Sequence, residues 1–372
     1  MSRAYLLFFS FLQTHSPNDN PACLIKKFKG NCYNDNQLNI ILVNNKEEEV
    51  LKIKGWEFTK THEPLKLVEK ETPKAEKDHV VIKTGAVGLC HSDVGTLEDE
   101  GWMALMNAPV IMGHENAGTI IEVGDGVTDF KEGDRVAICP TGPSGLAPGY
   151  AYDGGFGTHI HAPASDLVPV PDELSIKEAA SATDAGMTSY HALFTRGKAE
   201  KGMKIALIGI GGLGQFALQA AIAQGIEDIY AVDVSEKAQE LARKIGAKGV
   251  VSDISELADK DLDLVVDYAG FGVTTSKALE TVKPGGTVVL VGMGKLETTI
   301  NVTDFITKKK NLISSVGGDK EDIAAIYELM ASGDLSPTLS EITPDEIPEG
   351  IKKLERGEVQ GRLVAVYNDE EK

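Results

Sequence analysis

The chain has 372 residues, of which 42% are hydrophobic and 25% charged, which is typical of a soluble globular protein with room for two domains. It carries 37 basic against 56 acidic residues, and this net charge of −19 disfavours nucleic acid and anionic membrane surfaces as partners. Four scattered cysteines without a CxxC pair argue against a disulfide framework and favour a reducing compartment, the cytoplasm. No apolar run reaches the roughly 18 residues that a membrane span needs.

The first 50 residues differ from the rest of the chain. Residues 4–12 are apolar and follow Arg3, like the core of a signal peptide, but no small-x-small cleavage site comes after them. Asparagine is then frequent over residues 18–45. We interpret residues 1–50 as an extension outside the folded domains, and its order and role stay open.

Residues 51–185 have the texture of a β-rich, barrel-like domain. Short runs of alternating apolar and polar residues are separated by glycine, proline and charged turns, a pattern that indicates strands. The predicted strands cover residues 56–59, 65–68, 79–84, 118–123, 135–138, 154–162 and 167–170. Residues 177–199 have helical character and lead into the next part of the chain.

Residues 204–233 form the most informative stretch of the sequence. A β-branched and aliphatic run at 204–208 predicts a buried strand, and it ends in a GxGxxG turn. A predicted helix at 215–224 and a second strand at 228–232 follow, and Asp233 closes the unit. The glycines of this turn are Gly209, Gly211, Gly212 and Gly214.

Each of these residue types has a mechanical role in dinucleotide binding. Gly209 permits the tight turn, Gly211 lets the backbone approach a pyrophosphate, and Gly214 lets the helix pack closely on the strand. The helix N-terminus then offers free N–H groups and a favourable dipole to the anion. Asp233 can accept both ribose hydroxyls and would repel a 2′-phosphate, so the sequence favours NAD over NADP.

The chain continues to alternate strands and helices after Asp233, which predicts a parallel, doubly wound sheet over residues 186–324. A last strand at 361–367 is expected to return to the β-rich part, so that residues 325–372 form its C-terminal segment. The predicted helices cover residues 235–245, 273–282, 302–309 and 321–332. The predicted strands cover residues 262–267, 287–291 and 312–316, with another near residue 250.

Two short stretches ahead of the nucleotide unit carry metal-binding chemistry. Residues 88–93 read GLCHSD and residues 113–118 read GHENAG. The thiolate of Cys90 and the imidazole of His114, each near a carboxylate, are natural components of a zinc site. A single cysteine or histidine, however, is more often a core or surface residue.

These motifs together resemble the zinc-dependent alcohol dehydrogenases of the medium-chain dehydrogenase/reductase family. Residues 113–127 fit the zinc signature GHExxGxxxxxGxxV of that family, GLCHSD lies upstream, and the glycine turn lies downstream. The resemblance covers about residues 51–367. It implies an α/β protein with a split, β-rich GroES-like catalytic domain and a Rossmann domain.

The resemblance also implies a zinc site with Cys90, His114 and Asp184 as ligands and Glu115 behind the metal. Relatives usually have cysteine where Asp184 stands, but a carboxylate oxygen is an accepted zinc ligand. As a helix cap, Asp184 would have a purely structural role instead. Three protein ligands leave a fourth position for water or substrate, the pattern of a catalytic zinc site.

Further matches to the family concern the proton path and the cofactor. Ser92 matches the hydroxyl that bonds the substrate oxygen, and Asp93 the carboxylate that orients the ligating histidine. Relatives end the proton relay in a histidine where this chain has Gly95, so water or His91 could serve instead. The other matches are His91 and Arg362 for the pyrophosphate, Leu213 and Thr188 for the nicotinamide ring, Val291 and Met293 for its carboxamide, and Trp102 for the substrate pocket.

The sequence therefore predicts an NAD- and zinc-dependent alcohol dehydrogenase that interconverts alcohols with aldehydes or ketones. Only Cys139 lies where many relatives carry a four-cysteine structural zinc lobe, so we expect one zinc per chain. A polyol or secondary-alcohol dehydrogenase and a catalytically silent NAD-binding protein remain as alternatives. The resemblance further implies a homodimer or homotetramer.

Overall fold

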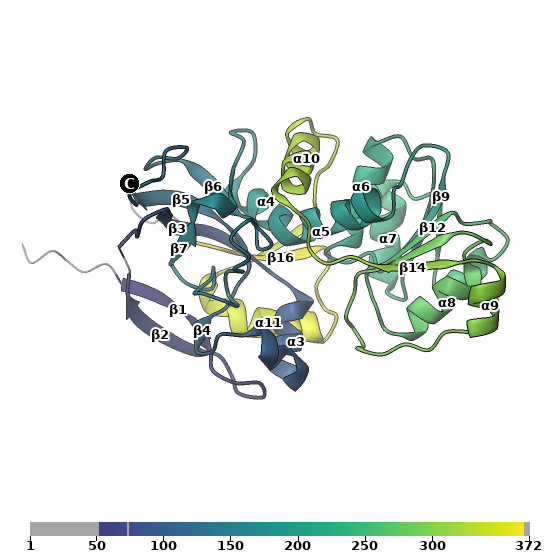
Figure 1. Cartoon of the computed structure of the whole chain (residues 1–372), viewed down its shortest axis with the longest axis horizontal. Coiled ribbons are helices and arrows are strands. Elements are labelled where there is room, and N and C mark those ends of the chain that lie inside the picture. Colours follow the sequence, from purple (N-terminus) through teal and green to yellow (C-terminus); the bar gives the residue numbers. More distant parts are fainter. Residues whose placement is uncertain (1–51, 73, 368–372) are drawn as a thin grey trace, which may run out of the picture. The chain divides into compact units, whose positions relative to one another are not determined.

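The computed structural model describes residues 52–72 and 74–367 (Figure 1). The extension predicted over residues 1–50, with its apolar stretch, lies outside the described residues. In the described part, no helix combines the length and the apolar character that crossing a bilayer requires. The described part holds two main sheets, one mixed and one parallel, and a small third sheet.

The mixed sheet has seven strands in the order β15-β16-β3-β5-β6-β8, and β7 pairs with β3. The small sheet has the order β2-β1-β4. The strands are β1 (Lys52–Phe58), β2 (Lys66–Glu71), β3 (His79–Leu89), β4 (Val110–Ile111), β5 (Glu115–Val123), β6 (Arg135–Ile138), β7 (His159–Pro163), β8 (Leu167–Pro169), β15 (Leu339–Ile342) and β16 (Arg362–Val366).

The last strand of the chain returns to this sheet, as the sequence pattern predicts. Strand β16 runs antiparallel to β3, with Leu363 opposite Leu89 and Val364 opposite Gly88. The mixed sheet therefore combines strands from both ends of the described chain, with the parallel sheet inserted between them. The domain boundaries given above stay a prediction.

The parallel sheet has six strands in the order β11-β10-β9-β12-β13-β14. The strand order runs to one side from β9 to β11 and then continues on the other side of β9 with β12, although all strands are parallel. Ligands of such sheets bind in the crevice at the carboxyl ends of the strands where the order switches, here β9 and β12. The predicted α/β fold class is confirmed. The strands are β9 (Lys204–Ile208), β10 (Asp228–Val232), β11 (Gly249–Val251), β12 (Leu264–Asp267), β13 (Thr287–Leu290) and β14 (Asn311–Ser314).

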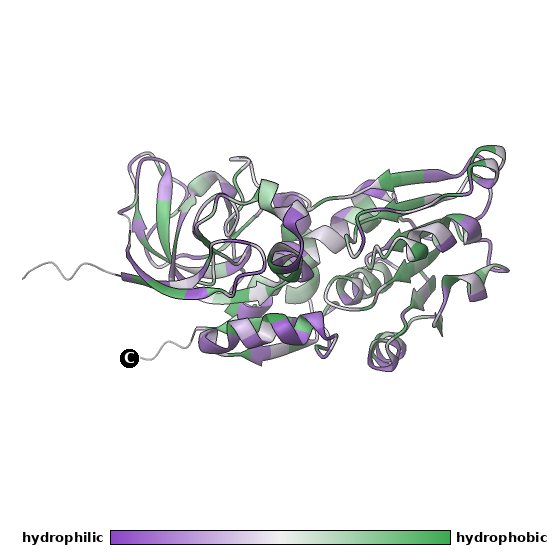
Figure 2. Ribbon diagram, turned by 90° about the horizontal axis from the view of Figure 1, so that it is seen from below, coloured by the Kyte–Doolittle hydropathy of each residue, from purple (hydrophilic) through white to green (hydrophobic). Residues whose placement is uncertain are grey.

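Helices cover both faces of the parallel sheet, and the central strands β9 and β12 are apolar on both sides, as expected for such a sheet. Ile205 and Leu207 of β9 pack in a cluster with α6 and α7, whereas Ala206 and Ile208 pack in one with α8 and α9. Figure 2 shows hydrophobic residues following the strands. These helices are α6 (Gly214–Ala223), α7 (Glu236–Ile245), α8 (Val273–Thr281) and α9 (Val302–Thr307).

A mostly helical segment before β9 contains two π-helical turns. The Tyr327 hydroxyl of α10 donates to the Ala179 carbonyl of this segment (3.0 Å), which ties the two together. The segment comprises α4 (Ile176–Ser181), η4 (Ala182–Gly186), α5 (Met187–Tyr190) and η5 (His191–Arg196), and η4 and η5 are π-helical. The other helices are α3 (His91–Glu98), α10 (Lys320–Ala331) and α11 (Ile347–Glu355), with 3-10 turns η2 (Glu100–Leu105), η3 (Ala164–Asp166), η6 (Ile254–Leu257) and η7 (Pro344–Glu346).

The stretch GLCHSD differs from what the strand pattern predicts. Strand β3 continues to Leu89 instead of ending at residue 84, and helix α3 begins directly after Cys90. The Cys90 N–H donates to Asp93 Oδ2 (2.8 Å). This bond gives the backbone N–H at the helix start a partner, as in a capping box. Cysteine is not among the residues preferred at the N-cap of a helix, so the sequence pattern does not predict this helix.

Candidate functional site

Three strand ends of the mixed sheet meet at the candidate site. Gly88 of β3 pairs with Glu115 of β5, and Leu89 pairs with Leu363 of β16. Cys90 follows β3 directly, His114 precedes β5, and Arg362 begins β16. The register of the sheet therefore brings together side chains that lie far apart in the sequence.

Asp184 reaches the same place from the π-helical turn η4. A π-turn widens the helix by one residue per turn, and such turns are frequent at functional sites. The Thr188 hydroxyl of α5 donates to Asp184 Oδ1 (3.0 Å) and so fixes the carboxylate. The ligand atoms of Cys90, His114 and Asp184 all lie within 4.8 Å of one another.

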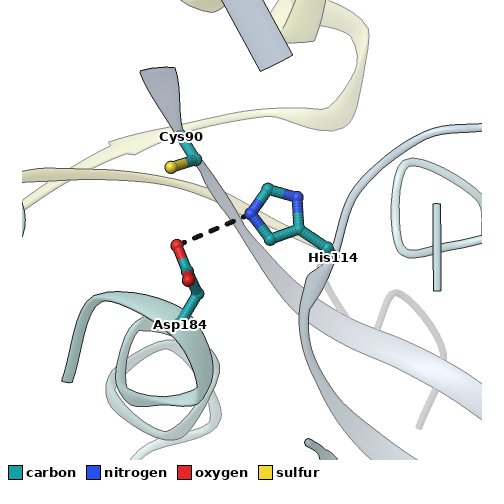
Figure 3. Close-up of side chains that lie close together, drawn as sticks. All are labelled: Cys90, His114 and Asp184. Carbon is teal, nitrogen blue, oxygen red and sulfur yellow. Dashed lines mark ion pairs between the residues drawn. The ribbon is translucent and has the colours of Figure 1, made fainter. Parts of the chain in front are cut away.

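The close-up in Figure 3 shows these three side chains facing a common point. His114 Nε2 lies 3.5 Å from Asp184 Oδ2. The Ser92 hydroxyl lies 3.4 Å from the same nitrogen, which places the predicted substrate-binding hydroxyl beside the group. On the other side of the ring, His114 Nδ1 lies 3.6 Å from Asp93 Oδ1.

The environment of His114 fits a divalent metal. Its Nδ1 and Asp93 Oδ1 are buried and lack a hydrogen-bond partner among the described residues, and they face each other across the short gap. A ligating histidine commonly directs its second nitrogen at a carboxylate in this way. Burial disfavours a charged imidazole, yet the contacts with Tyr150, Asp184 and Asp93 raise the pKa of His114 well above its ordinary value. The site thus favours a positive charge, which a bound cation provides.

Asp184 is held in the ionised form that a ligand needs. Burial alone would raise the pKa of its carboxyl, but the hydrogen bond and charge of His114, together with Arg362, outweigh burial and lower it. One sulfur, one nitrogen and one oxygen donor are an ordinary zinc set. The residues present therefore fit zinc.

Glu115 and Arg362 form a buried ion pair beside the candidate ligands. The Arg362 guanidinium donates to both Glu115 oxygens (2.8 and 2.7 Å) and to Asp184 Oδ2 (3.1 Å). Glu115 Oε1 also accepts the Ala185 N–H (2.8 Å), so both oxygens of this carboxylate already have hydrogen-bond partners. The geometry thus favours a supporting ion pair for Glu115 over metal ligation.

Arg362 also reaches the glycine turn. Its Nη1 lies 2.7 Å from where a Cβ on Gly212 would stand, so the guanidinium adjoins both the candidate ligands and the predicted pyrophosphate site. Gly209 has φ of 88°, which favours glycine, and a Cβ on Gly214 would clash with the Gly209 carbonyl. Gly211 has open space above it.

Asp233 lies at the carboxyl end of β10, beside the glycine turn. Its Oδ2 accepts the Ile210 N–H (2.7 Å) and its Oδ1 accepts the Ser235 N–H (2.8 Å). These two bonds fix the carboxylate in place. The structure therefore presents a negative charge where the sequence predicts adenosine ribose.

The remaining predicted cofactor residues are spread over several elements. Thr188 is buried and bonded to Asp184, as described above. Leu213 precedes α6 and packs against the cluster that includes Phe216. The other three are His91, exposed at the start of α3, Val291, half-buried after β13, and Met293, exposed in the same loop.

Comparison with known proteins identifies the family of the chain. Residues 76–172 match the alcohol dehydrogenase GroES-like domain, and residues 212–332 match the zinc-binding dehydrogenase domain. An alcohol dehydrogenase of Geobacillus stearothermophilus is 34% identical over 324 residues, which cover 81% of this chain and 95% of that protein. The chain belongs to the zinc-type alcohol dehydrogenases of the medium-chain dehydrogenase/reductase family. This confirms the predicted family and the predicted class, the NAD(P)-dependent oxidoreductases.

Two solved structures resemble this dehydrogenase along most of its length. Acetophenone reductase from Geotrichum candidum in complex with NAD has a TM-score of 0.79 and 30% identity, covering 86% of this chain and 98% of that one. 2R,3R-butanediol dehydrogenase from Bacillus subtilis has a TM-score of 0.75 and 25% identity, covering 85% and 100%. Relatives of different substrate classes thus share this fold.

Two aromatic residues complete the surroundings of the site in this dehydrogenase. The Tyr150 ring stands edge-on to the His114 imidazole, with ring centroids 5.5 Å apart. No motif marks Tyr150, so sequence reasoning missed it. The Trp102 indole lies 2.8 Å from where a Cβ on Gly95 would stand. Trp102 therefore occupies the space that the relay histidine of other relatives would need.

A second group of possible ligand atoms in this dehydrogenase is a helix cap. His191, Asp319 and Asp322 also lie within 4.8 Å of one another, at the start of α10. The two aspartates cap the helix reciprocally, each accepting the N–H of the other at 3.0 Å. Asp322 additionally bonds His191 Nδ1 (2.6 Å), so these carboxylates already have their partners.

The thiol of Cys139 is buried in the hydrophobic core of the dehydrogenase. It lies 3.7 Å from Met187 Sδ, and burial raises its pKa. It therefore behaves as a core residue. The expectation of a single zinc per chain stays a prediction.

Proposed function

We propose that this dehydrogenase interconverts alcohols with aldehydes or ketones by hydride transfer to and from NAD, with one zinc ion per chain. The convergence of Cys90, His114 and Asp184 beside the Ser92 hydroxyl carries this proposal. A zinc ion held by these three side chains would supply the Lewis acidity that activates a substrate oxygen. Three protein ligands leave one coordination position for substrate.

The side chains around the ligands hold and move protons. The Ser92 hydroxyl accepts the proton of the substrate alcohol and returns it in the reverse reaction. Asp93 fixes the His114 ring so that Nε2 stays unprotonated when it ligates. Position 95 is a glycine, and Trp102 fills the space above it, so no side chain there can carry the proton away from Ser92. Water or His91 takes the proton instead.

The cofactor lies along the glycine turn in this proposal. The N-terminus of α6 and Arg362 Nη1, which adjoins Gly212, face the pyrophosphate. Asp233 accepts the ribose hydroxyls. A 2′-phosphate would meet the negative charge of Asp233, so NAD is the preferred cofactor. In the same proposal His91 contacts the pyrophosphate and Leu213 the nicotinamide ring. The carboxamide of that ring is contacted by Val291 and Met293.

Metal content and NADH formation, measured together, test the proposal. The purified protein should contain one zinc per chain and produce NADH from primary or secondary alcohols. A chelator should abolish the activity, and added zinc should restore it. Cys90→Ser should lose zinc and activity together, whereas the matched control Cys139→Ser should keep both. Full activity of the zinc-free protein would refute the proposal.

Three other functions remain to be compared with this one. A polyol or secondary-alcohol dehydrogenase is favoured by the likeness to butanediol dehydrogenase, and a substrate panel separates the two. A silent NAD-binding protein would have no use for Ser92 beside three potential ligands. The same argument disfavours a zinc-free quinone reductase.

We also propose assembly into a homodimer or homotetramer in the cytoplasm. Strand β14 is an edge of the parallel sheet, and Val302 and Ile306 of the neighbouring α9 expose 58% and 65% of their surface. Val316, after β14, is 85% exposed. Such an apolar edge suits pairing with a second copy. Sedimentation of the purified protein tests the assembly.

A further inference from the structure

Asp267 is the last residue of β12, and its carboxylate is fully buried at the carboxyl end of the parallel sheet. Its Oδ1 accepts the N–H groups of Ala269 (3.1 Å) and Gly270 (2.8 Å). Its Oδ2 accepts the hydroxyls of Thr274 (2.7 Å) and Thr275 (2.8 Å). All four donors belong to the loop that follows β12 and to the first turn of α8, so one side chain holds this whole connection.

The backbone of Asp267 joins the neighbouring strand ends. In the sheet it pairs with the last residue of β9 on one side and with the last residue of β13 on the other. Its carbonyl accepts the N–H groups of Val291 and Gly292, both at 3.0 Å. Asp267 therefore lies between the glycine turn after β9 and residues 291–293 after β13. We call residues 268–273 the β12 loop and residues 291–293 the carboxamide segment, after the contact predicted for them.

The β12 loop touches both of these neighbours. A Cβ on Gly209 would lie 3.2 Å from the Ala269 nitrogen, so the glycine turn packs closely against the loop. Gly270 has φ of 61°, and a Cβ on it would clash with the Gly292 carbonyl oxygen, so these two backbones are in contact. The spacing between the glycine turn and the carboxamide segment therefore depends on the loop that Asp267 holds.

The β12 loop presents apolar side chains on this fixed backbone. Phe271 is 55% exposed, and Val273, which begins α8, is 59% exposed. The Lys295 N–H donates to the Gly270 carbonyl (2.9 Å), which ties the loop to the chain beyond the carboxamide segment. The loop stands at the carboxyl ends of β9 and β12, where sheets of this order bind their ligands. It is therefore suited to contact a ligand in this crevice.

A binding loop that is already ordered raises affinity, because the ligand does not have to order it. We propose that Asp267 is a positioning residue for the cofactor, which sets the affinity for NAD by holding the glycine turn and the carboxamide segment at a fixed spacing. Asp267 acts through the β12 loop, because its buried carboxylate already accepts four bonds from the protein. This inference rests on the proposed function and deepens its account of cofactor binding.

Calorimetric titration of the zinc-loaded protein with NAD and with ADP-ribose tests this inference. ADP-ribose lacks the nicotinamide, so it cannot contact the carboxamide segment. Asp267→Ala should raise the Kd of NAD about 10- to 100-fold. The Kd of ADP-ribose should rise less than about fivefold, because the spacing of the two segments matters only to a ligand that contacts both.

Asp263→Ala is the matched control, because Asp263 stands directly before β12, at the opposite end of the same strand. Its Oδ2 accepts the Lys204 N–H (2.7 Å), and its carboxylate pairs with Lys283. This variant should lower the thermal stability of the protein and leave both Kd values unchanged. Asp267→Asn keeps an oxygen that can accept the two loop N–H groups, so it should restore most of the affinity for NAD.

Three results would overturn the inference. The first is wild-type affinity for NAD in Asp267→Ala. The second is an equal loss for NAD and ADP-ribose, because Asp267 would then not link the two segments. The third is an equal loss in Asp263→Ala, which would show only a general effect of stability. If Asp267→Ala does not fold, Thr275→Val removes a single bond of the carboxylate. It should raise the Kd of NAD at least about threefold, and wild-type affinity in this variant would overturn the inference as well.

The wild type separates a failure of this inference from a failure of the proposed function. If the zinc-loaded wild type binds neither NAD nor ADP-ribose, the proposed function and the inference fail together. If the wild type binds NAD and the Asp267 variants bind it equally well, only the inference fails.

Discussion

Replacing Arg362 by glutamine is expected to destabilise the mixed sheet strongly. The Arg362 side chain is 3% exposed and forms a two-bond ion pair with Glu115, which is fully buried. It also bonds Asp184. Glutamine leaves the Glu115 carboxylate buried without a counter-charge, so the protein loses an interaction and retains an unpaired charge.

The size of the effect follows from burial. Removing one partner of a buried ion pair costs about 3–5 kcal/mol, a large part of the roughly 5–15 kcal/mol that keeps a domain folded. The double variant Arg362→Gln/Glu115→Gln has no buried charge at this pair, because two amides face each other. It should cost less than Arg362→Gln alone, and the cycle should give a coupling energy of about 1.5–3 kcal/mol.

Urea unfolding monitored by tryptophan fluorescence measures these differences. The chain has two tryptophans, Trp56 and Trp102, and both lie in the predicted catalytic domain that holds the ion pair. Metal-free protein should be used, because bound zinc would stabilise the variants unequally. A cost below about 1 kcal/mol for Arg362→Gln, or a double variant as unstable as the sum of the single ones, would refute the reasoning.

Three further outcomes are expected. Asp233→Gly removes the charge that repels a 2′-phosphate, so the ratio of kcat/KM for NADP to that for NAD should rise at least about tenfold; an unchanged ratio would contradict the assigned role. Thr188→Val removes the hydrogen bond to Asp184 while it keeps the side-chain shape, and zinc affinity in a chelator competition should fall about 10- to 100-fold, whereas wild-type affinity would exclude a positioning role. The pKa of Asp184 is lowered in the metal-free fold although burial opposes this, so its ionised form stabilises the protein above the ordinary Asp range. That contribution is lost as the pH falls through the lowered value, and Asp184→Asn should give a flatter acid limb in unfolding experiments; parallel limbs would contradict this expectation.

The nucleotide unit could be predicted from the sequence because its determinants are local. The strand, the glycine turn and α6 follow one another directly, and the positive φ of Gly209 and the close contact of Gly214 with the Gly209 carbonyl both arise within this turn. The candidate ligands Cys90, His114 and Asp184 could be predicted from the family motifs. The structure adds that their ligand atoms lie close enough to share an ion.

Features that depend on contacts between distant residues could not be predicted. The ion pair of Arg362 with Glu115 depends on how β16 and β5 align with β3, which no local pattern specifies. The π-helical turn that presents Asp184 has the same apolar and small residues as an ordinary helix. Tyr150 reaches the site through contact between two glycine backbones, which periodicity does not reveal.

The position of β16 near the end of the chain has a consequence for biosynthesis. Ribosomes make proteins from the N-terminus, so Glu115 emerges long before Arg362, 247 residues later in the sequence. A nascent chain that has completed β3 and β5 therefore still lacks the cation that neutralises Glu115. The candidate site acquires its final charge balance only after residue 362 has been synthesised, and truncation before residue 362 deprives the protein of it.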